Sequence, residues 1–248
     1  MVAVEVAVAV EAEATPAASA SAALAIQLVD VIRVYREVDV ETIALRGINL
    51  EVAVGEFVAI MGRSGSGKST LLQLLAGSDR PTAGRVIVDG IDLSRAEEED
   101  RRRLRGAHVG IVFQSGNLVP FLDLEENVYL AAELAGRPID RAVTRAILDR
   151  VGLAGRERHR PSQLSGGEQQ RAALAAILAT RPPIVLADEV TGELDSATAE
   201  RLLDLLVQVH RHERMTLVMA THDSHVAERA DRIVELRDGR VVADRRLR

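Results

Sequence analysis

Cysteine is absent from this 248-residue chain, and aromatic residues make up only 2% of it, with no tryptophan. Without cysteine the chain can form neither disulfides nor cysteine-ligated metal sites, and a cytoplasmic setting fits best. With so few rings, the core must be filled by Leu, Val, Ile and Ala, which suits a parallel sheet covered by helices. At this length, with 47% hydrophobic residues, we expect one sizeable α/β core and a smaller attached subdomain.

Long apolar runs and excess positive charge are also lacking. No uninterrupted apolar stretch approaches the roughly 20 residues that a membrane-spanning helix needs, so a role at a membrane would require a partner. The formal net charge of -6 offers no basic surface for DNA or RNA, so nucleic acid is disfavoured as a partner. Lys68 is the single lysine among 31 basic residues, which indicates a special chemical demand at that position.

The N-terminal segment, residues 1–25, is a low-complexity run rich in Ala and Val. It lacks the basic start and the long apolar centre of a secretory signal. Its composition predicts a disordered tail, while the alternation around Val4, Val6, Val8 and Val10 leaves an edge strand open as the alternative. We expect the ordered domain to span residues 26–248.

Hydrophobic patterning beyond the tail predicts an α/β core with a helical insertion. Strand patterns occur before residue 114 and again after residue 183, and helical periodicity fills the segment between them. We therefore expect a helical subdomain over about residues 115–180, and a solvent-exposed helix face for the charged run from Arg95 to Arg105. The predicted strands are 26–34, 48–54, 57–61, 86–88, 109–113, 184–187, 216–220 and 233–236, and the predicted helices are 125–135, 141–151, 168–179 and 197–210.

A glycine-rich loop lies between the buried strand 57–61 and leucines at helical spacing. Its glycines let backbone N–H groups surround an anion, and the helix that follows presents its positive end. Lys68 would reach the β- and γ-phosphates, and the Ser69 hydroxyl would coordinate Mg²⁺. The motif predicts nucleotide binding but not transport. The predicted phosphate-binding residues are Gly62, Arg63, Ser64, Gly65, Ser66, Gly67, Lys68, Ser69 and Thr70.

Two acidic residues, Asp188 and Glu189, end the apolar run 184–187. They would lie at the carboxyl edge of the sheet, where doubly wound folds bind ligands. Asp188 is expected to hold Mg²⁺ through water. Glu189 is expected to orient or deprotonate the attacking water, which requires a carboxylate in line with the γ-phosphate.

The segment LSGGEQQ, Leu164 to Gln170, carries a second anion-binding pattern. Ser165 and Glu168 have the spacing of a capping box, so a helix with free backbone amides should begin here. A capping box alone is ordinary, but Gly166 and Gly167 would let a triphosphate approach the backbone closely. The chain would then carry two phosphate-binding surfaces.

In order and spacing, these motifs resemble the nucleotide-binding domain of ABC transporters from about residue 26 to the C-terminus, and LSGGE is the most specific of them. The resemblance implies a P-loop NTPase (RecA-like) core with an antiparallel β subdomain and an inserted helical subdomain. It also implies ATP and Mg²⁺ as ligands and a head-to-tail homodimer. Each ATP would lie between the P-loop of one copy and Ser165, Gly166 and Gly167 of the other.

The resemblance also implies roles for single residues. Tyr35 matches the aromatic residue that stacks on adenine, and Gln114 matches the residue that senses Mg²⁺ and the membrane partner. His222 matches the switch at the γ-phosphate, and Asp195 matches the loop acid that crosses the dimer interface. The expected partner is an integral membrane permease, which would hold this subunit at the cytoplasmic face of the cell membrane.

Within the family, segments 113–128 and 187–196 resemble the lipoprotein-release and macrolide-export branch. Three positions depart from the pattern: Val190 replaces the usual proline, Glu193 a frequent asparagine and Ala176 a frequent arginine. None of these changes removes a catalytic group. Because proline would have fixed φ, Val190 is expected to loosen slightly the turn that aims Glu189.

Two other functions agree with part of the sequence. A soluble ABC-type ATPase could act as a mechanical regulator in repair, translation or cell division. The chain has neither the long coiled coils of the repair ATPases nor the tandem domains of the translation factors, while cell-division signalling through a permease-like partner stays open. A nucleotide-binding module without hydrolysis is opposed by Glu189 and His222.

Overall fold

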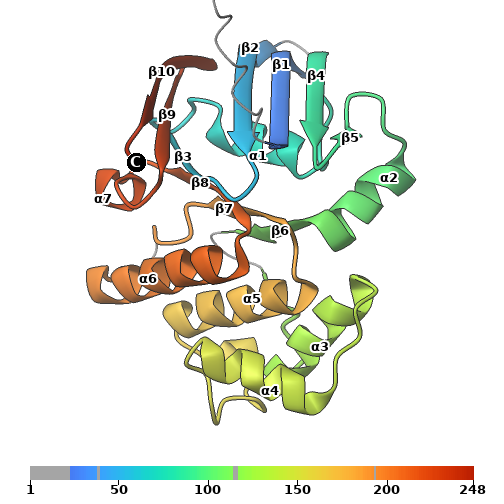
Figure 1. Ribbon diagram of the computed structural model, residues 1–248, viewed down its shortest axis with the longest axis vertical. Helices are drawn as coiled ribbons and strands as arrows, with labels where there is room; N and C mark the ends of the chain where they lie inside the picture. The colour runs from blue at the N-terminus through green and yellow to red at the C-terminus, as the bar shows by residue number, and fades with distance from the viewer. Residues whose placement is uncertain (1–22, 38–39, 114–116, 193) are drawn as a thin grey trace, which may run out of the picture.

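The computed structural model describes residues 23–37, 40–113, 117–192 and 194–248, and its strands form two sheets (Figure 1). A six-stranded sheet in the order β10-β9-β3-β8-β7-β6 lies at the centre, and a four-stranded sheet in the order β2-β1-β4-β5 covers one side of it. The central strands are β3 Phe57–Met61, β6 Val109–Val112, β7 Ile184–Asp188, β8 Thr216–Thr221, β9 Arg232–Arg237 and β10 Arg240–Arg246. The strands of the second sheet are β1 Leu24–Glu37, β2 Val40–Ala53, β4 Ala83–Val88 and β5 Ile91–Asp92.

Parallel pairing in the central sheet brings the functional loops together. β3 pairs in parallel with β8 and β9, and β7 pairs in parallel with β6 and β8. Strands β3, β7 and β8 are almost continuously apolar, as expected for parallel strands with both faces covered. Because they run in one direction, the segments that follow them emerge at the same sheet edge. Those segments carry the P-loop, Glu189 and His222.

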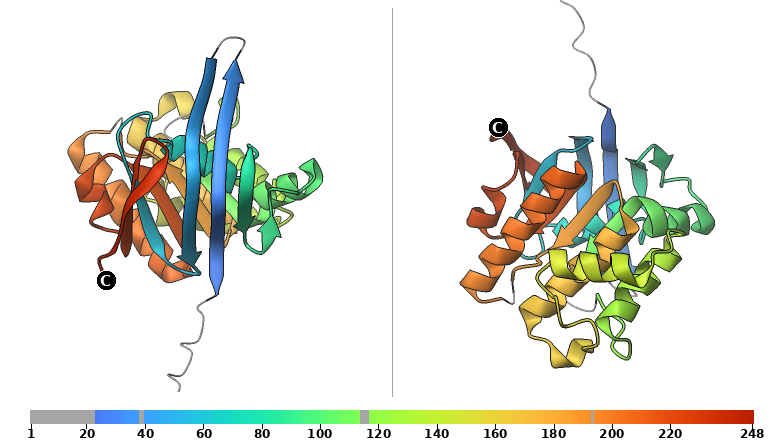
Figure 2. Two further views of the ribbon diagram at one scale, coloured as in Figure 1. Left: turned by 90° about the horizontal axis from the view of Figure 1, so that it is seen from above. Right: turned by 60° about the horizontal axis from the view of Figure 1, so that its bottom comes forward.

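The second sheet is antiparallel throughout, in agreement with the predicted antiparallel β subdomain. β1 and β2 are each 14 residues long, and Figure 2 shows that they project as a hairpin beyond the central sheet. β1 extends at both ends beyond the predicted strand 26–34, and its pairing with β2 is irregular at several points between Leu24 and Val34. Most of the predicted tail, residues 1–22, lies outside the described residues, but Leu24 and Ala25 already belong to β1.

Helices cover both faces of the central sheet and build two apolar cores. One core lies between the two sheets around α1, and the other joins the opposite face of the central sheet to α5 and α6. The helices α3, α4 and α5 follow one another between β6 and β7 and lie together below the sheet in Figure 1. The helices are α1 Lys68–Leu75, α2 Glu98–Arg103, α3 Leu124–Leu134, α4 Arg141–Arg150, α5 Gly166–Thr180, α6 Ser196–Glu213 and α7 Ser224–Ala227, with a π-helical turn at Leu104–His108 and a 3-10 turn at Pro161–Gln163.

The charged run from Arg95 to Arg105 corrects one prediction. It does contain a helix, α2, but Arg101 is only 1% exposed and does not lie on a solvent-exposed face. Burial lowers the pKa of its guanidinium, and the charge of Arg80 acts in the same direction. The group is satisfied by backbone carbonyls and thereby fixes α2 to the loop that follows α1. The carbonyls that accept its hydrogen bonds belong to Gly77, Asp79, Leu93 and Ala96.

Every strand and helix predicted between residues 26 and 236 is present, with ends displaced by a few residues, except that β2 begins eight residues before the predicted strand 48–54. The strands β5 and β10 and the short helix α7 were not predicted. Among the described residues, none of the helices combines the length and the hydrophobicity needed to cross a membrane.

Candidate functional site

The P-loop connects β3 to α1 and folds tightly around the side chain of Lys68. Gly67 precedes the helix with φ +105°, and a Cβ there would lie 2.8 Å from the carbonyl oxygen of Ala44, so only glycine fits. Lys68 is only 5% exposed, and its Nζ donates to the carbonyl oxygens of Gly62 at 2.8 Å and Arg63 at 3.3 Å. The one lysine of the chain therefore lies inside its own glycine loop.

Glu189 connects this loop to the ends of β7 and β8. Its Oε1 lies 3.4 Å from Nζ of Lys68 and 3.4 Å from Nδ1 of His222. The backbone of Glu189 has φ +47°, a left-handed conformation that costs energy in a residue other than glycine, and its N–H donates to the carbonyl of Ala220 at 3.0 Å. The strain and this hydrogen bond fix the direction in which the carboxylate points.

Asp188 is the last residue of β7 and is half-buried. Burial raises the pKa of its carboxyl group, the charge of Glu189 adds to this, and a hydrogen bond from the Ser69 hydroxyl acts in the opposite direction. Its Oδ1 is buried and has no hydrogen-bond partner. A buried carboxylate oxygen without a donor, beside a hydroxyl, suits a hard cation such as Mg²⁺.

The other ligands of a bound Mg²⁺ would not be a cluster of acidic side chains. Within the described residues there is no group of three or more His, Cys, Asp or Glu residues that could hold a metal ion. Ser69, Asp188 and the phosphates of a nucleotide nevertheless make an oxygen-rich set. Gln114, which was predicted as a further ligand, lies outside the described residues.

The capping box predicted for LSGGEQQ is confirmed. Ser165 precedes α5, its Oγ accepts from the N–H of Glu168 at 3.3 Å, and its own N–H donates to Glu168 Oε2 at 2.9 Å. The N–H of Ser165 and its hydroxyl, which donates to Glu168 Oε2 at 3.0 Å, lower the pKa of the Glu168 carboxyl group. Ser165 shares no hydrogen bond or ion pair with the P-loop in the part of the chain that the structure describes.

The two glycines of the LSGGEQQ segment, Gly166 and Gly167, which we call the signature glycines, have different surroundings. A Cβ on Gly167 would lie 2.2 Å from Cγ2 of Thr198 in α6, whereas the nearest atom to a Cβ on Gly166 is Cδ2 of Leu194 at 3.6 Å. Gly167 is buried and Gly166 is exposed. Gly167 is therefore needed for packing between two helices, and only Gly166 fits the expectation of a glycine that leaves room for a ligand.

Tyr35 and Asp195 both make hydrogen bonds within the chain. The Tyr35 hydroxyl donates to Asp79 Oδ2 at 2.9 Å, and the ring is partly exposed. Asp195 is exposed and caps α6 by accepting from the N–H of Thr198 at 3.1 Å, and hydrogen bonds from the Thr198 side chain and backbone lower the pKa of its carboxyl group. Neither residue belongs to the buried core.

Sequence reasoning missed a third strand end that lines the P-loop. Residues 235–238, the end of β9 and the start of the turn to β10, border a cavity of about 560 Å³ together with residues 62–66. The N–H of Gly239 donates to the carbonyl of Ser66 at 3.1 Å, so this turn supports the loop. The dipeptide Asp238-Gly239 is a strong hairpin signal and could have revealed both the turn and β10.

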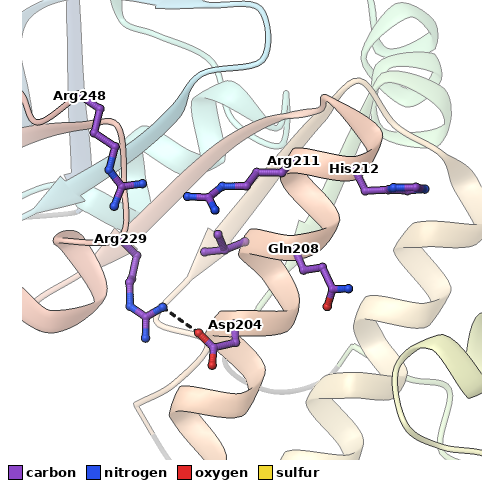
Figure 3. Close-up of a pocket in the computed structure, with 7 residues that line it drawn as sticks. Asp204, Gln208, Arg211, His212, Arg229 and Arg248 are labelled. Atoms are coloured by element: carbon purple, nitrogen blue, oxygen red, sulfur yellow. Dashed lines mark hydrogen bonds and ion pairs between the residues drawn. The ribbon is translucent and has the colours of Figure 1, made fainter.

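A second cavity, of about 520 Å³, lies on the outer side of α6 and contains none of the predicted site residues (Figure 3). Arginines dominate it, and Arg229 is paired there with Asp204 at 2.7 Å and with Glu200 at 2.6 Å. The labelled side chains come from α6, from the segment after α7 and from the C-terminus. This cavity is therefore separate from the site around Lys68.

Comparison with known proteins agrees with this site. A family model described as ABC transporter matches residues 45–192. An uncharacterized ABC transporter ATP-binding protein of Mycobacterium tuberculosis is 45% identical over 219 residues, which is 88% of each chain. The macrolide export ATP-binding/permease protein MacB of Brucella melitensis is 45% identical over 221 residues, 88% of this chain and 34% of that protein.

Among solved structures, the dimeric ATP-binding cassette MJ0796 in a post-hydrolysis state, bound to ADP and Pi, has a TM-score of 0.83 and 39% identity, covering 90% of this chain and 99% of that chain. A P-loop between parallel strands, two strand-end acids and a capped LSGGE helix thus define an ABC-type ATPase. The chain belongs to the ABC transporter family. Its resemblance to the macrolide-export branch agrees with the MacB relatives.

Proposed function

We propose that this chain hydrolyses ATP in a head-to-tail dimer of two copies and thereby powers a separate membrane permease of the export or release type. The observation that carries the proposal is the position of Glu189, whose carboxylate contacts both Lys68 and His222. A cation for the phosphates, a carboxylate for water and a histidine near both are the groups that phosphoryl transfer to water requires.

The P-loop and Lys68 bind the phosphates in this scheme. Backbone N–H groups of the loop surround the phosphate oxygens, and the positive end of α1 adds to the attraction. Ser69, Asp188 and Gln114 would hold Mg²⁺, which when bound neutralises negative charge on the β- and γ-phosphates. Lys68 places its charge at the same phosphates, because its Nζ is already fixed at the centre of the loop.

Glu189 is the group that orients and deprotonates the attacking water. Its strained backbone aims the carboxylate toward Lys68, and hence toward the γ-phosphate that Lys68 would bind. His222 lies on the other side of Glu189, and its side chain is 64% exposed, so it can move to contact the γ-phosphate. Loss of the γ-phosphate on hydrolysis would therefore be transmitted to β8 through a movement of His222.

Two copies are needed because the P-loop and the Ser165 cap of one copy are separate anion sites. The P-loop and the Ser165 cap share no hydrogen bond within the described residues, yet both are anion sites. In a head-to-tail dimer each ATP would lie between the P-loop of one copy and the start of α5 in the other copy. Ser165 and Gly166 would mark that surface, and Asp195 would lie beside it at the start of α6.

The contact with the permease is proposed for the helical segment of about residues 115–180, which we treat as a subdomain, at the cytoplasmic face of the membrane. Phe121 is 70% exposed just before α3, in a protein that has only three phenylalanines. Exposed aromatic residues of this kind are typical of interaction surfaces. Leu118 is a poorer candidate, because it packs against the core.

Variants at Glu189 and Lys68 test the proposal. Glu189→Gln should bind ATP with normal affinity but turn over about 10²–10⁴-fold more slowly, since a general base is lost while the phosphate contacts remain. It should also accumulate as an ATP-dependent dimer in size-exclusion chromatography at high protein concentration. Lys68→Ala should lose ATP binding.

The control is Glu213→Gln, which removes a surface carboxylate that pairs with Arg150, away from the site around Lys68. It should leave binding, turnover and assembly unchanged. Normal hydrolysis by Glu189→Gln would refute the assignment of the base, and normal hydrolysis by a strictly monomeric form would refute the shared site.

A further inference from the structure

Tyr35 does not stand alone on β1 but forms a compact cluster with Arg33 and Asp79. Asp79 Oδ2 accepts hydrogen bonds from the Tyr35 hydroxyl at 2.9 Å and from Nε of Arg33 at 2.7 Å. Arg33 and Tyr35 are two residues apart on one strand and therefore point to the same side. The Arg33 guanidinium carbon lies 4.3 Å from the centroid of the Tyr35 ring, within the range of a cation–π contact.

The cluster is anchored to the helix that carries the P-loop. Asp79 follows α1, its Oδ1 accepts from the N–H of Arg80 at 2.7 Å, and its carbonyl accepts from the buried Arg101 at 2.8 Å. The Arg33 and Asp79 side chains are only 22% and 20% exposed, so this ion pair is screened less by solvent than one on the open surface. The Tyr35 hydroxyl also lies 3.5 Å from Gln73 Oε1 in α1.

These contacts fix the ring in two ways. The hydrogen bond to Asp79 stops the phenol from rotating away, and the guanidinium covers one ring face, which leaves the opposite face for another planar group. A ring that is held in place before binding loses less conformational freedom when a ligand stacks on it.

We propose that Arg33 and Asp79 are positioning residues that hold Tyr35 for stacking on the nucleobase, with the base confined to the ring face opposite Arg33. The inference rests on the stacking role proposed for Tyr35. It predicts that the cluster contributes to the affinity for ligands with a base and contributes nothing to the affinity for a bare phosphate chain.

The test compares ATP with inorganic tripolyphosphate by titration calorimetry. Tyr35→Ala should weaken ATP binding by about 5- to 140-fold, the range of base stacking on an aromatic ring. Asp79→Asn removes the negative charge that pairs with Arg33, and its single remaining oxygen cannot both accept from Tyr35 and Arg33, which share Oδ2, and accept from the N–H of Arg80, which uses Oδ1. It should weaken ATP binding by at least about twofold, which corresponds to a loss of roughly half of the weakest stacking energy. Neither change should alter the affinity for tripolyphosphate.

The matched control is Asp92→Asn, in β5 of the sheet that contains Arg33 and Tyr35. Asp92 makes the same kinds of contact as Asp79, since its Oδ2 pairs with Arg85 at 3.2 Å and its Oδ1 accepts from the N–H of Ser94 at 3.1 Å, but it contacts neither Arg33 nor Tyr35. This variant should bind ATP normally. Arg33→Met provides a second route to the same result if Asp79→Asn folds poorly.

Tyrosine emission gives a direct view of the ring. Because the chain has two tyrosines and no tryptophan, Tyr129→Phe leaves Tyr35 as the sole fluorophore. ATP should quench its emission, tripolyphosphate should not, and Asp79→Asn should shift the ATP titration to higher concentration.

The outcomes separate the two proposals. If Tyr35→Ala weakens ATP while Asp79→Asn and Arg33→Met do not, the positioning role is wrong and the stacking role stands. If Tyr35→Ala has no effect, both are wrong. Equal loss of ATP and tripolyphosphate affinity in Asp79→Asn would show a general structural role, and added loss in the double variant with Tyr35→Ala would show that Asp79 does not act through the ring.

Discussion

The two signature glycines offer the sharpest separation of packing from ligand binding. Alanine at position 167 would place its Cβ 2.2 Å from Cγ2 of Thr198, against an optimum of about 3.5–4.0 Å for two carbon atoms. Alanine at position 166 would meet its nearest neighbour at 3.6 Å, an ordinary contact. Gly167→Ala should therefore push α5 away from α6, and Gly166→Ala should not.

The size of the effect follows from two opposing contributions. Overpacking costs about 1–3 kcal/mol, and a contact this short favours the upper end. Replacing glycine by alanine in a helix returns up to about 1 kcal/mol, so the net loss for Gly167→Ala is about 2 kcal/mol. For a chain of this length this corresponds to a melting temperature lower by about 4–8 °C. Gly166→Ala should melt at the wild-type temperature or slightly above it.

Thermal melts and ATP-dependent dimerisation together complete the test. Thr198→Ser deletes the clashing methyl group but keeps the hydroxyl that accepts from Arg201, so Gly167→Ala with Thr198→Ser should regain most of the lost stability. Gly166→Ala, although stable, should fail to dimerise with ATP in the Glu189→Gln background. A wild-type melting temperature for Gly167→Ala, or no rescue by Thr198→Ser, would refute the packing argument.

Three further predictions concern other parts of the molecule. The folded pKa of Asp188 is raised above 3.8, so its ionisation lowers the free energy of unfolding as the pH rises through that raised value. Asp188→Asn should therefore melt above wild type at pH 7 in calorimetry, by a margin that shrinks toward pH 3.8, while losing Mg²⁺-dependent ATPase activity. An equal or lower melting temperature at pH 7 would contradict this cost of ionising Asp188. Arg101→Met leaves buried carbonyls without donors and should lower the free energy of unfolding by more than about 3 kcal/mol in a urea titration, whereas Arg102→Met, at an exposed neighbour, should be neutral; equal stability of the two would show that the carbonyls find other partners. Phe121→Asp should keep basal ATPase activity and lose stimulation by a reconstituted permease, while Leu118→Asp should lower the melting temperature; loss of both activities in Phe121→Asp would place Phe121 in the fold instead of the interface.

Local signals were sufficient where one segment determines its own structure. The P-loop was predictable because its glycines, its lysine and the flanking strand and helix are contiguous, and the Ser165 cap because its partner is three residues away. The same applies to the strand that ends at Asp188. In each case the physical cause lies within a few residues of its effect.

Features that depend on distant segments were not predictable. Arg101 resembles a surface charge, and its burial depends on carbonyls that come from two separate loops, one after α1 and one after β5. The close approach of Gly167 to Thr198 joins two helices that are separated by β7, and the left-handed backbone of Glu189 follows from how β7 meets β8. β10 is a different case: as an edge strand with mostly charged, exposed residues it lacks a hydrophobic pattern, and only the local Asp238-Gly239 turn signal could have revealed it.

The placement of the one lysine has a consequence for covalent chemistry. Reagents that acylate amines find no exposed lysine side chain on this protein, because Lys68 is 5% exposed and holds its ammonium inside the P-loop. Apart from the α-amino group, any such reagent must enter the nucleotide cradle to react, and reaction there removes the charge that phosphate needs. The rate at which Lys68 is acylated therefore measures how often that cradle opens, and a ligand that fills it should protect the protein from a label that mass spectrometry can count.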